Sequence, residues 1–315
     1  MKRVSSPYVA LVYAAFTLMT QLSAQADTFG GGTTNEFTID FVNIGNTGNA
    51  ADTTTYGAVP YEYRASTHEI SQNDITKATA SGMANVTAGA WTGNQPAANI
   101  SWYEAAAFVN FLNTNSGKTA AYDLTFSNGS WSMALWSSEQ AWTEGGTNLY
   151  RNKDAFYFLP SANEWYKAAY YNPAGSNYFI YPTASSSVPT AVASGTSAGT
   201  AVYEQDFAQG PAEVTLAGGL SPYGTMGQGG NVWEWNESAF NGTNSTSSEN
   251  RAIRGAYWAE SSRFLRSSTR HSINPAGDNS NIGFRVASVP EPSTYALLLM
   301  AGAGWLLWKR RKASL

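Results

Sequence analysis

Cysteine is absent from the 315-residue sequence, and histidine occurs only twice, at His68 and His271. The absence of cysteine excludes disulfides, thiolate metal sites and cysteine nucleophiles. Two histidines cannot supply a three-histidine metal site from one chain. Charged residues are also scarce, at 13% of the chain, about half the usual share of roughly 25%.

Apolar and aromatic residues, by contrast, are plentiful. Hydrophobic residues make up 43% and aromatic residues 14% of the chain, which favours a folded protein with a sizeable core. With so few charges, the surface must be built mainly from Ser, Thr, Asn and Gly. That composition is more typical of exported and cell-surface proteins than of cytosolic enzymes.

The first 26 residues have the pattern of a secretory signal peptide. Lys2 and Arg3 precede a mostly apolar run over 9–22, and Ala24-Gln25-Ala26 supplies a small-residue cleavage signal. We expect cleavage before Asp27 and therefore export. A buried N-terminal helix is the alternative.

The C-terminal segment, residues 289–315, has three parts. Pro290, Glu291 and Pro292 precede an apolar run over 295–308, and four cations follow at 309–312. The run is shorter than the roughly 20 residues that span a bilayer comfortably, and the cations would stay cytoplasmic. This tail resembles the PEP-CTERM sorting signal of Gram-negative bacteria that secrete exopolysaccharide.

The PEP-CTERM resemblance implies recognition of Pro290, Glu291 and Pro292 by an exosortase and removal of the tail. It also implies transient contact with the inner membrane through the short transmembrane segment, and delivery to the cell envelope, surface or extracellular matrix. An ordinary tail anchor is the alternative.

Charge is distributed unevenly along the chain. The segments 1–26 and 293–315 carry six of the 18 cations and no acids, so residues 27–292 hold 12 cations against 22 acids, a net charge of −10. Such an acidic domain is a poor nucleic-acid binder, because phosphates need compensating cations. Six of the twelve cations are arginines between Arg251 and Arg285. They form either a local anion site or, as we prefer, structural arginines paired with carboxylates.

The pattern along residues 27–288 predicts one α+β domain with few helices, short strands and many long loops. Alternating residues predict strands over 36–44 and 60–70, and closing strands over 251–258 and 282–287. Three serines, each followed three residues later by an acid, predict helix starts: Ser71, Ser101 and Ser161. Polar, aperiodic sequence predicts long loops over 183–199 and 241–248.

Several motifs occur in order over roughly residues 36–288. They are an entry element that starts with YEY at 61–63 and runs through Ile75, NISWYEA at 99–105, FLPSANEW at 158–165, GNVWEW at 230–235, RGAYW at 254–258 and GFR at 283–285. Together they resemble the formylglycine-generating enzyme family, also called the sulfatase-modifying factor domain. The resemblance implies, for residues 27–288, a variant of the C-type lectin fold with little regular secondary structure. We expect Trp102, Trp165, Trp233 and Trp235 to be core residues and Arg285 to be buried against an acid.

The same resemblance implies that the family chemistry is absent. Active members oxidise a substrate cysteine with copper held by two cysteines, and those positions are Ser262 and Ser267 here. Copper(I) prefers sulfur ligands, whereas a serine hydroxyl is hard and stays protonated. A related branch that forms C–S bonds with iron uses three histidines, which this chain lacks. We therefore expect a pseudoenzyme.

Arg263, Arg266, Arg270 and His271 surround the two serine positions in sequence and are the candidate cleft residues. A serine nucleophile with His271 as base would also need an acid to orient the imidazole, and only Asp278 is near in sequence. An enzyme of altered chemistry in the same cleft therefore remains the alternative to a non-catalytic protein.

Calcium is the one cofactor that the resemblance suggests. It implies a site formed by the backbone carbonyls of Gly230 and Val232 and the carboxylate of Glu234, which are hard oxygen ligands suited to calcium. A fourth ligand normally stands three residues before the first glycine, but that position is Gly227. We expect weakened calcium binding and no other cofactor.

The leading hypothesis is an exported, non-catalytic binding or structural module of the cell envelope or exopolysaccharide matrix. Its ligand would be a polysaccharide or a peptide. Neutral sugars need stacking aromatic rings, and the region of Trp131, Trp136 and Trp142 supplies them if those rings are exposed.

Overall fold

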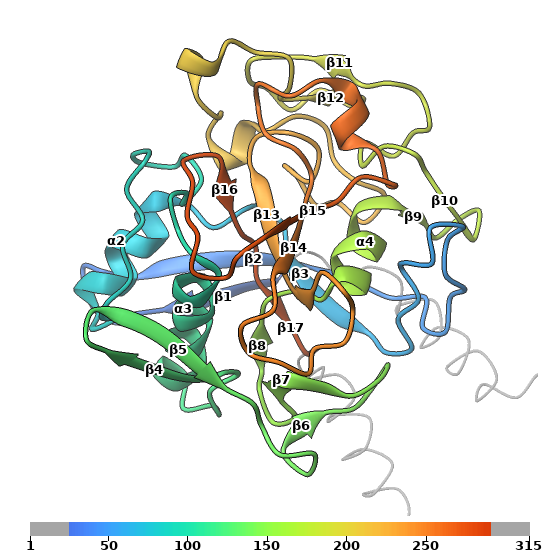
Figure 1. The fold of residues 1–315 in the computed structure, drawn as a ribbon. Helices are drawn as coiled ribbons and strands as arrows, with labels where there is room; N and C mark the ends of the chain where they lie inside the picture. The colour runs from blue at the N-terminus through green and yellow to red at the C-terminus, as the bar shows by residue number, and fades with distance from the viewer. Residues whose placement is uncertain (1–24, 291–315) are drawn as a thin grey trace, which may run out of the picture.

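The computed structural model describes residues 25–290, and Figure 1 shows their arrangement. Most of the predicted signal peptide, Glu291 and Pro292 of the sorting motif, and the apolar run over 295–308 lie outside these residues. Within residues 25–290, no helix is long and apolar enough to cross a membrane.

A five-stranded sheet carries both ends of the described chain. Its strand order is β1-β2-β3-β17-β8, and all neighbours are antiparallel. The strand predicted over 36–44 is confirmed as β2, with Phe37, Ile39 and Phe41 buried and the residues between them exposed. The bounds are β1 Gln25–Phe29, β2 Phe37–Ile44, β3 Tyr63–Ser66, β8 Tyr157–Phe158 and β17 Ala287–Ser288. The strand expected over 60–70 is thus only four residues long.

Three helices begin as predicted from their serine caps. They are α2 (Gln72–Ala80), α3 (Trp102–Asn115) and α4 (Ala162–Tyr170). In each, the capping serine accepts a hydrogen bond from the N3 amide, and the N3 carboxylate accepts one from the backbone of the cap. These reciprocal bonds satisfy amide groups that would otherwise lack partners, which fixes the starts of the helices.

A second sheet has the strand order β15-β14-β13-β16. Its strands are β13 (Trp233–Ala239), β14 (Arg251–Arg254), β15 (His271–Ile273) and β16 (Ile282–Gly283). The predicted closing strand over 282–287 is interrupted, because β16 belongs to this sheet and β17 to the first. Residues 284–286 pass from one sheet to the other, and this crossover carries Arg285.

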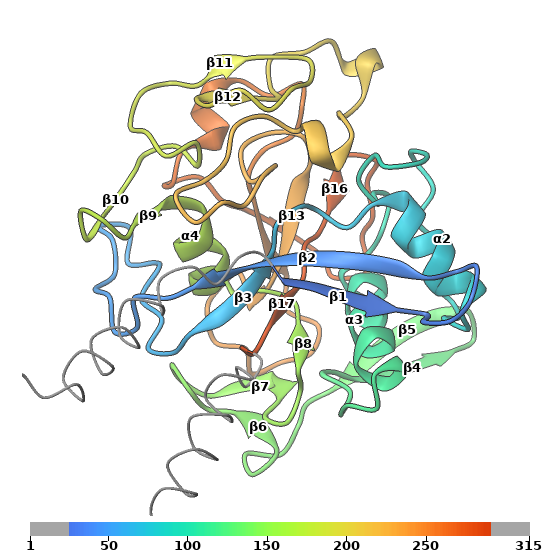
Figure 2. The ribbon, with the colours of Figure 1, turned by 180° about the vertical axis from the view of Figure 1, so that it is seen from behind.

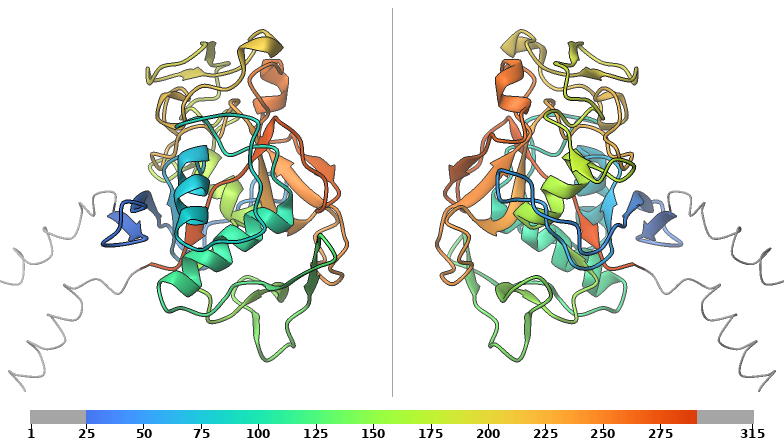
Figure 3. Two further views of the ribbon diagram at one scale, coloured as in Figure 1. Left: turned by 90° about the vertical axis from the view of Figure 1, so that its left-hand side faces the viewer. Right: turned by 90° about the vertical axis from the view of Figure 1, so that its right-hand side faces the viewer.

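Short two-stranded pairs make up the rest of the strands. They are β4 (Asp123–Ser127) with β5 (Ser130–Ala134), β6 (Ala141–Trp142) with β7 (Asn148–Asn152), β9 (Tyr171–Asn172) with β10 (Asn177–Tyr178), and β11 (Thr190–Ala191) with β12 (Thr200–Ala201). Within the predicted loop over 183–199, only the two residues of β11 belong to a strand. Figures 2 and 3 show that the loops around β11 and β12 project away from the five-stranded sheet.

Aromatic side chains fill the core, as the composition predicts. Trp102, Trp165 and Trp235 are fully buried and Trp233 is nearly so. Large rings bury much apolar area where regular elements are short, so this core does not depend on long helices or strands.

Candidate functional site

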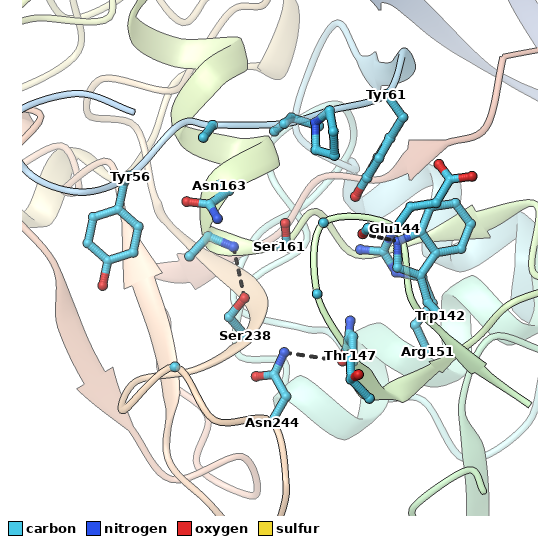
Figure 4. A pocket seen from close by; sticks show the side chains of 18 of the residues that line it. Tyr56, Tyr61, Trp142, Glu144, Thr147, Arg151, Ser161, Asn163, Ser238 and Asn244 are labelled. Atoms are coloured by element: carbon cyan, nitrogen blue, oxygen red, sulfur yellow. Dashed lines mark hydrogen bonds between the residues drawn. The ribbon is translucent and has the colours of Figure 1, made fainter. Parts of the chain in front are cut away.

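A cleft of about 210 Å³, partly open to solvent, lies beside the first turn of α4. The loop before β3, the β6–β7 hairpin and the turn after β13 complete its walls (Figure 4). We call it the α4 cleft and define it by the side chains that line it: Tyr56, Tyr61, Trp142, Asn148, Asn163 and Ser238.

A buried ion cluster forms the floor of the α4 cleft. The Arg151 guanidinium lies 2.8 Å from Glu164 Oε2 and 2.7 Å from Glu237 Oε2, and all three side chains are buried. The Tyr61 hydroxyl donates to Glu164, and Tyr122 and Asn148 donate to Glu237. One arginine is thus shared by two carboxylates, and neighbouring donors satisfy the remaining oxygens.

The two carboxylates of this floor differ in acidity. Burial acts to raise both pKa values, but for Glu164 the adjacent guanidinium and the hydrogen bonds outweigh it, so its pKa is lowered. For Glu237 burial prevails over Arg151, and its pKa is raised. Burial and the Glu164 charge also raise the pKa of the Tyr61 phenol. Glu164 is therefore the firm ionic partner of Arg151, and Glu237 takes up a proton more readily.

Two aromatic rings form one wall of the cleft. Trp142 meets Tyr61 edge to face, with ring centroids 5.2 Å apart, and its Nε1 donates to the Glu144 carbonyl. Of the three tryptophans named from the sequence, Trp142 alone lines the cleft, since Trp131 and Trp136 donate to backbone carbonyls elsewhere. Sequence reasoning missed the contribution of Tyr56 and Tyr61. Tyr61 was expected inside the strand over 60–70, but it lies in the loop before β3, and Tyr56 carried no signal of its own.

Polar groups line the opposite side, at the start of α4. Asn163 Oδ1 accepts from the Gly57 amide, and Ser238 Oγ accepts from the Ala162 amide. Within residues 25–290, the Asn163 amide nitrogen and the Ser238 hydroxyl proton have no protein partner. Both groups are held in place through their acceptor atoms and remain free to donate to a ligand.

The family cysteine positions lie outside the α4 cleft. Ser262 begins a 3₁₀ turn, and its amide faces Glu204. Ser267 is buried, and its hydroxyl bonds the Tyr166 phenol, which in turn bonds Asp52. Burial and Asp52 raise the Tyr166 pKa to about 12, and a neutral phenol is no base for a serine.

His271 is not placed as a base for either serine. Its ring packs on Trp233 and Phe264, with centroid distances of 5.0 and 5.8 Å. No hydrogen bond joins it to Ser262 or Ser267 in the part of the chain that the structure describes. Neither serine position is therefore paired with His271 in the way that a serine hydrolase pairs its nucleophile and base.

The other candidate cleft residues are dispersed. Arg263 lies over the Phe264 ring, and Arg266 donates to the Tyr181 hydroxyl. Arg270 lies 5.2 Å from the Tyr56 ring centroid and donates to the Phe240 carbonyl. Only Arg270 thus reaches the border of the α4 cleft.

The expectation that the C-terminal arginines pair with carboxylates is right for Arg285 and wrong for its neighbours. Among residues 25–290, Arg285 alone of these six forms a salt bridge, with Glu234. Arg251 instead lies 4.4 and 4.0 Å from the ring centroids of Trp102 and Tyr150. Guanidinium groups are planar and weakly hydrated, so aromatic faces and backbone carbonyls can stabilise them without an acid.

The residues expected to hold calcium do not fit the ion. Both Glu234 oxygens accept from Arg285 at 2.6 Å, and Trp165 Nε1 donates to one of them. Gly227 cannot be the site of a further ligand, because its φ is +81° and a Cβ there would lie 2.5 Å from Glu69 Oε2. Within residues 25–290, no group of three or more His, Asp or Glu could hold a metal ion.

A second cavity, of about 170 Å³, lies beside His68. Burial and the nearby Arg285 charge lower the His68 pKa. The neighbouring Asp74 carboxylate caps α2, and the Glu69 carboxylate is bonded to Asn231. These acids are therefore engaged in the fold.

Residues 31–289 match the family model described as the sulfatase-modifying factor enzyme 1-like domain. The chain belongs to this family. A second match, over 288–312, is the PEP-CTERM protein-sorting motif. Among curated proteins, no sequence matches the chain.

Two solved structures resemble the whole domain. "Treponema denticola variable protein 1" is 20% identical with a TM-score of 0.58, covering 85% of this chain and 100% of its own. CarF is 18% identical with a TM-score of 0.55, covering 80% of this chain and 99% of its own. At these identities the likeness shows the fold, which is the mixed, C-type-lectin-like architecture expected from the motifs.

The sorting motif bears on where the protein is delivered and how its tail is processed. It indicates export and surface sorting, and it implies processing by an exosortase-type enzyme. Pro290, the first residue of the motif, directly follows Val289, whose amide donates to the Phe156 carbonyl at the edge of the fold. The processing motif therefore begins directly after a residue that is hydrogen-bonded into the fold.

Proposed function

We propose that this sulfatase-modifying factor-like domain is a non-catalytic binding module of the cell envelope or exopolysaccharide matrix, with the α4 cleft as its ligand site. The observation that carries the proposal is the chemistry of the cleft. It presents aromatic rings and free amide and hydroxyl donors, while its floor charges are already paired. Such a site can hold a ligand, and among the described residues no basic side chain is hydrogen-bonded to the Ser238 hydroxyl to activate it.

The route to the surface completes the proposal. The signal peptide of residues 1–26 is removed before Asp27, and the tail is cut at Pro290-Glu291-Pro292 after transient contact with the inner membrane. Asp27 would be the first mature residue, and its carboxylate lies 2.6 Å from the buried Arg64 guanidinium. The same cut would remove Gln25 and Ala26, the first two residues of β1, so the mature strand would begin at Asp27.

The non-catalytic part of the proposal has a direct test. Copper-loaded protein should leave a sulfatase-motif cysteine peptide unmodified, because serine occupies both family cysteine positions. Mass spectrometry of the peptide measures the outcome. Conversion of the cysteine to formylglycine would refute the proposal, and a catalytically active family member serves as the positive control.

The binding part is tested by co-sedimentation of the purified full-length protein with exopolysaccharide from the producing bacterium. We expect binding that a calcium chelator does not change, since Glu234 is committed to Arg285. Trp142→Ala should weaken binding, whereas Trp131→Ala, a tryptophan outside the cleft, should not. Failure of the unaltered protein to sediment with the polysaccharide would contradict a matrix ligand.

A further inference from the structure

We propose that the α4 cleft binds one uncharged pyranose unit of a polysaccharide and rejects sugars that carry a carboxylate. This inference rests on the proposed binding function and names the class of its ligand.

The size of the cleft limits the occupant. Its volume of about 210 Å³ is below the range of about 300–1,000 Å³ that is usual for pockets holding drug-sized ligands. An extended peptide with several side chains would not be enclosed by a cleft of this size. A single sugar ring, with the rest of its chain in solvent, is an occupant of suitable size.

The aromatic wall suits the face of a sugar ring. Trp142 and Tyr61 are both half-buried, and their edge-to-face contact, at an interplanar angle of 75°, holds the two rings in place, so one ring face can stack on a sugar while the other ring lies beside it. The C–H groups on one face of a pyranose carry partial positive charge, which complements the negative face of an aromatic ring. The wall is further held by the Tyr61 hydroxyl, which donates to Glu164.

The polar side suits sugar hydroxyls. Asn163 at the start of α4, Ser238 of β13 and Thr147 of the β6–β7 hairpin all line the cleft (Figure 4). Within residues 25–290, the Asn163 amide nitrogen, the Ser238 hydroxyl proton and the Thr147 hydroxyl have no protein partner. Sugar hydroxyls both donate and accept, so they can satisfy such groups without a formal charge.

The charges around the cleft disfavour an anion. Arg151 is the one cation among the lining residues, and its guanidinium is shared by Glu164 and Glu237. Glu144 adds an exposed carboxylate at the rim. A uronate would therefore meet the Glu144 carboxylate, and the further cation at the border of the cleft, Arg270, is already held by the Phe240 carbonyl and by the Tyr56 and Phe240 rings.

A cation gains little either. Each oxygen of Glu164 and Glu237 already accepts hydrogen bonds from Arg151, and each accepts another from a neighbouring donor. The Glu144 carboxylate at the exposed rim is the acid that an ammonium group could reach, and solvent screens that interaction. Uncharged sugar units are therefore the class of ligand that suits both the aromatic wall and the polar side of the cleft.

The experiment titrates four oligosaccharides against the purified full-length protein and follows tryptophan fluorescence and heat. The probes are cellotetraose and chitotetraose (neutral), trigalacturonate (anionic) and the chitosan tetramer (cationic). We expect at least one neutral probe to bind at least ten-fold more tightly than either charged probe. Trp142→Ala should weaken that binding at least ten-fold, and Trp131→Ala should leave it unchanged.

A rim variant tests the charge argument separately. Glu144→Lys should improve trigalacturonate binding at least three-fold, whereas Glu139→Lys, an exposed acid that does not line the cleft, should not. Equal or tighter binding of a charged probe by the unaltered protein would overturn the inference, as would neutral binding that survives Trp142→Ala.

The two proposals fail in distinguishable ways. If no probe binds but the bacterial exopolysaccharide still co-sediments, the assignment of a neutral unit to the α4 cleft is wrong and the matrix function stands. If neither the probes nor the exopolysaccharide bind, both proposals fail.

Discussion

Two buried clusters in this protein each combine one arginine with two carboxylates, yet they are built differently. In the floor of the α4 cleft, Arg151 bridges Glu164 and Glu237 and donates to both. In the crossover between the sheets, Arg285 gives a bidentate contact to Glu234 alone. The second acid there, Glu69, accepts instead from the Asn231 amide and the Val232 backbone.

The two clusters differ in how the arginine charge is used: Arg151 serves two carboxylates, whereas Arg285 serves one. Burial and the Glu234 charge raise the pKa of Glu69 well above its ordinary range, so this acid tends to hold a proton. At the cleft, Arg151 lowers the pKa of one acid and only moderates the rise in the other. Exclusive pairing gives Glu234 a cation of its own, whereas at the cleft two carboxylates depend on one guanidinium, although both centres are buried.

The largest expected effect is on the exclusive pair. Glu234→Gln leaves Arg285 buried without its anion, which should cost about 3–5 kcal/mol of unfolding free energy. Urea denaturation followed by tryptophan fluorescence measures this loss. A loss of less than about 1 kcal/mol would show that the backbone carbonyls around Arg285 stabilise its charge without Glu234. The contrast between exclusive and shared pairing would then be wrong.

A smaller loss is expected where the arginine is shared. Glu237→Gln keeps Glu164 as the partner of Arg151, and the glutamine carbonyl can still accept from Tyr122 or Asn148. We expect a loss of about 1–3 kcal/mol, measured by the same denaturation. A loss of unfolding free energy equal to that of Glu234→Gln would contradict this expectation. It would mean that Arg151 needs both carboxylates, so that sharing does not make the loss of one of them less harmful.

The smallest effect concerns pH and Glu69. Because its pKa is higher in the folded than in the unfolded chain, the folded state binds more protons between the two values. Its contribution to stability is therefore full below the unfolded pKa near 4.5 and is lost as the pH rises through the folded pKa. Glu69→Gln should flatten this part of the stability profile between pH 4.5 and neutrality.

The control for this pH effect is Glu62→Gln, which removes an exposed acid of the same segment. Its stability profile should follow that of the unaltered protein. If Glu69→Gln also leaves the profile unchanged, Glu69 is ionised in the folded state and the cluster must be balanced by another group.

Local signals in the sequence predicted the helix starts and the aromatic core. Ser71, Ser101 and Ser161 each lie three residues before an acid, and all three form the expected capping boxes. The partner of Arg285 could not be named, because Glu234 lies 51 residues away in the chain. Glu164 was predicted as a cap, which it is, but its ion pair with Arg151 has no sequence signature.

The candidate site was the least predictable feature. Sequence reasoning grouped Arg263, Arg266, Arg270 and His271 because they are close in the chain, and the fold disperses them. The α4 cleft instead joins a loop near Tyr56, a hairpin at Trp142 and the turn after β13. These segments lack periodicity, and only their packing against α4 brings them together.

The sequence by itself determined the family, the loss of the thiolates, the sorting route and the positions of the helix caps. Each depends on residue identity or on contacts within a few residues, which a linear reading contains. The tertiary structure decided which acids share an arginine and which rings face a cleft. It also placed Glu69 so close to Gly227 that no side chain fits there. Those outcomes depend on distances between segments far apart in the chain, and only the folded packing sets them.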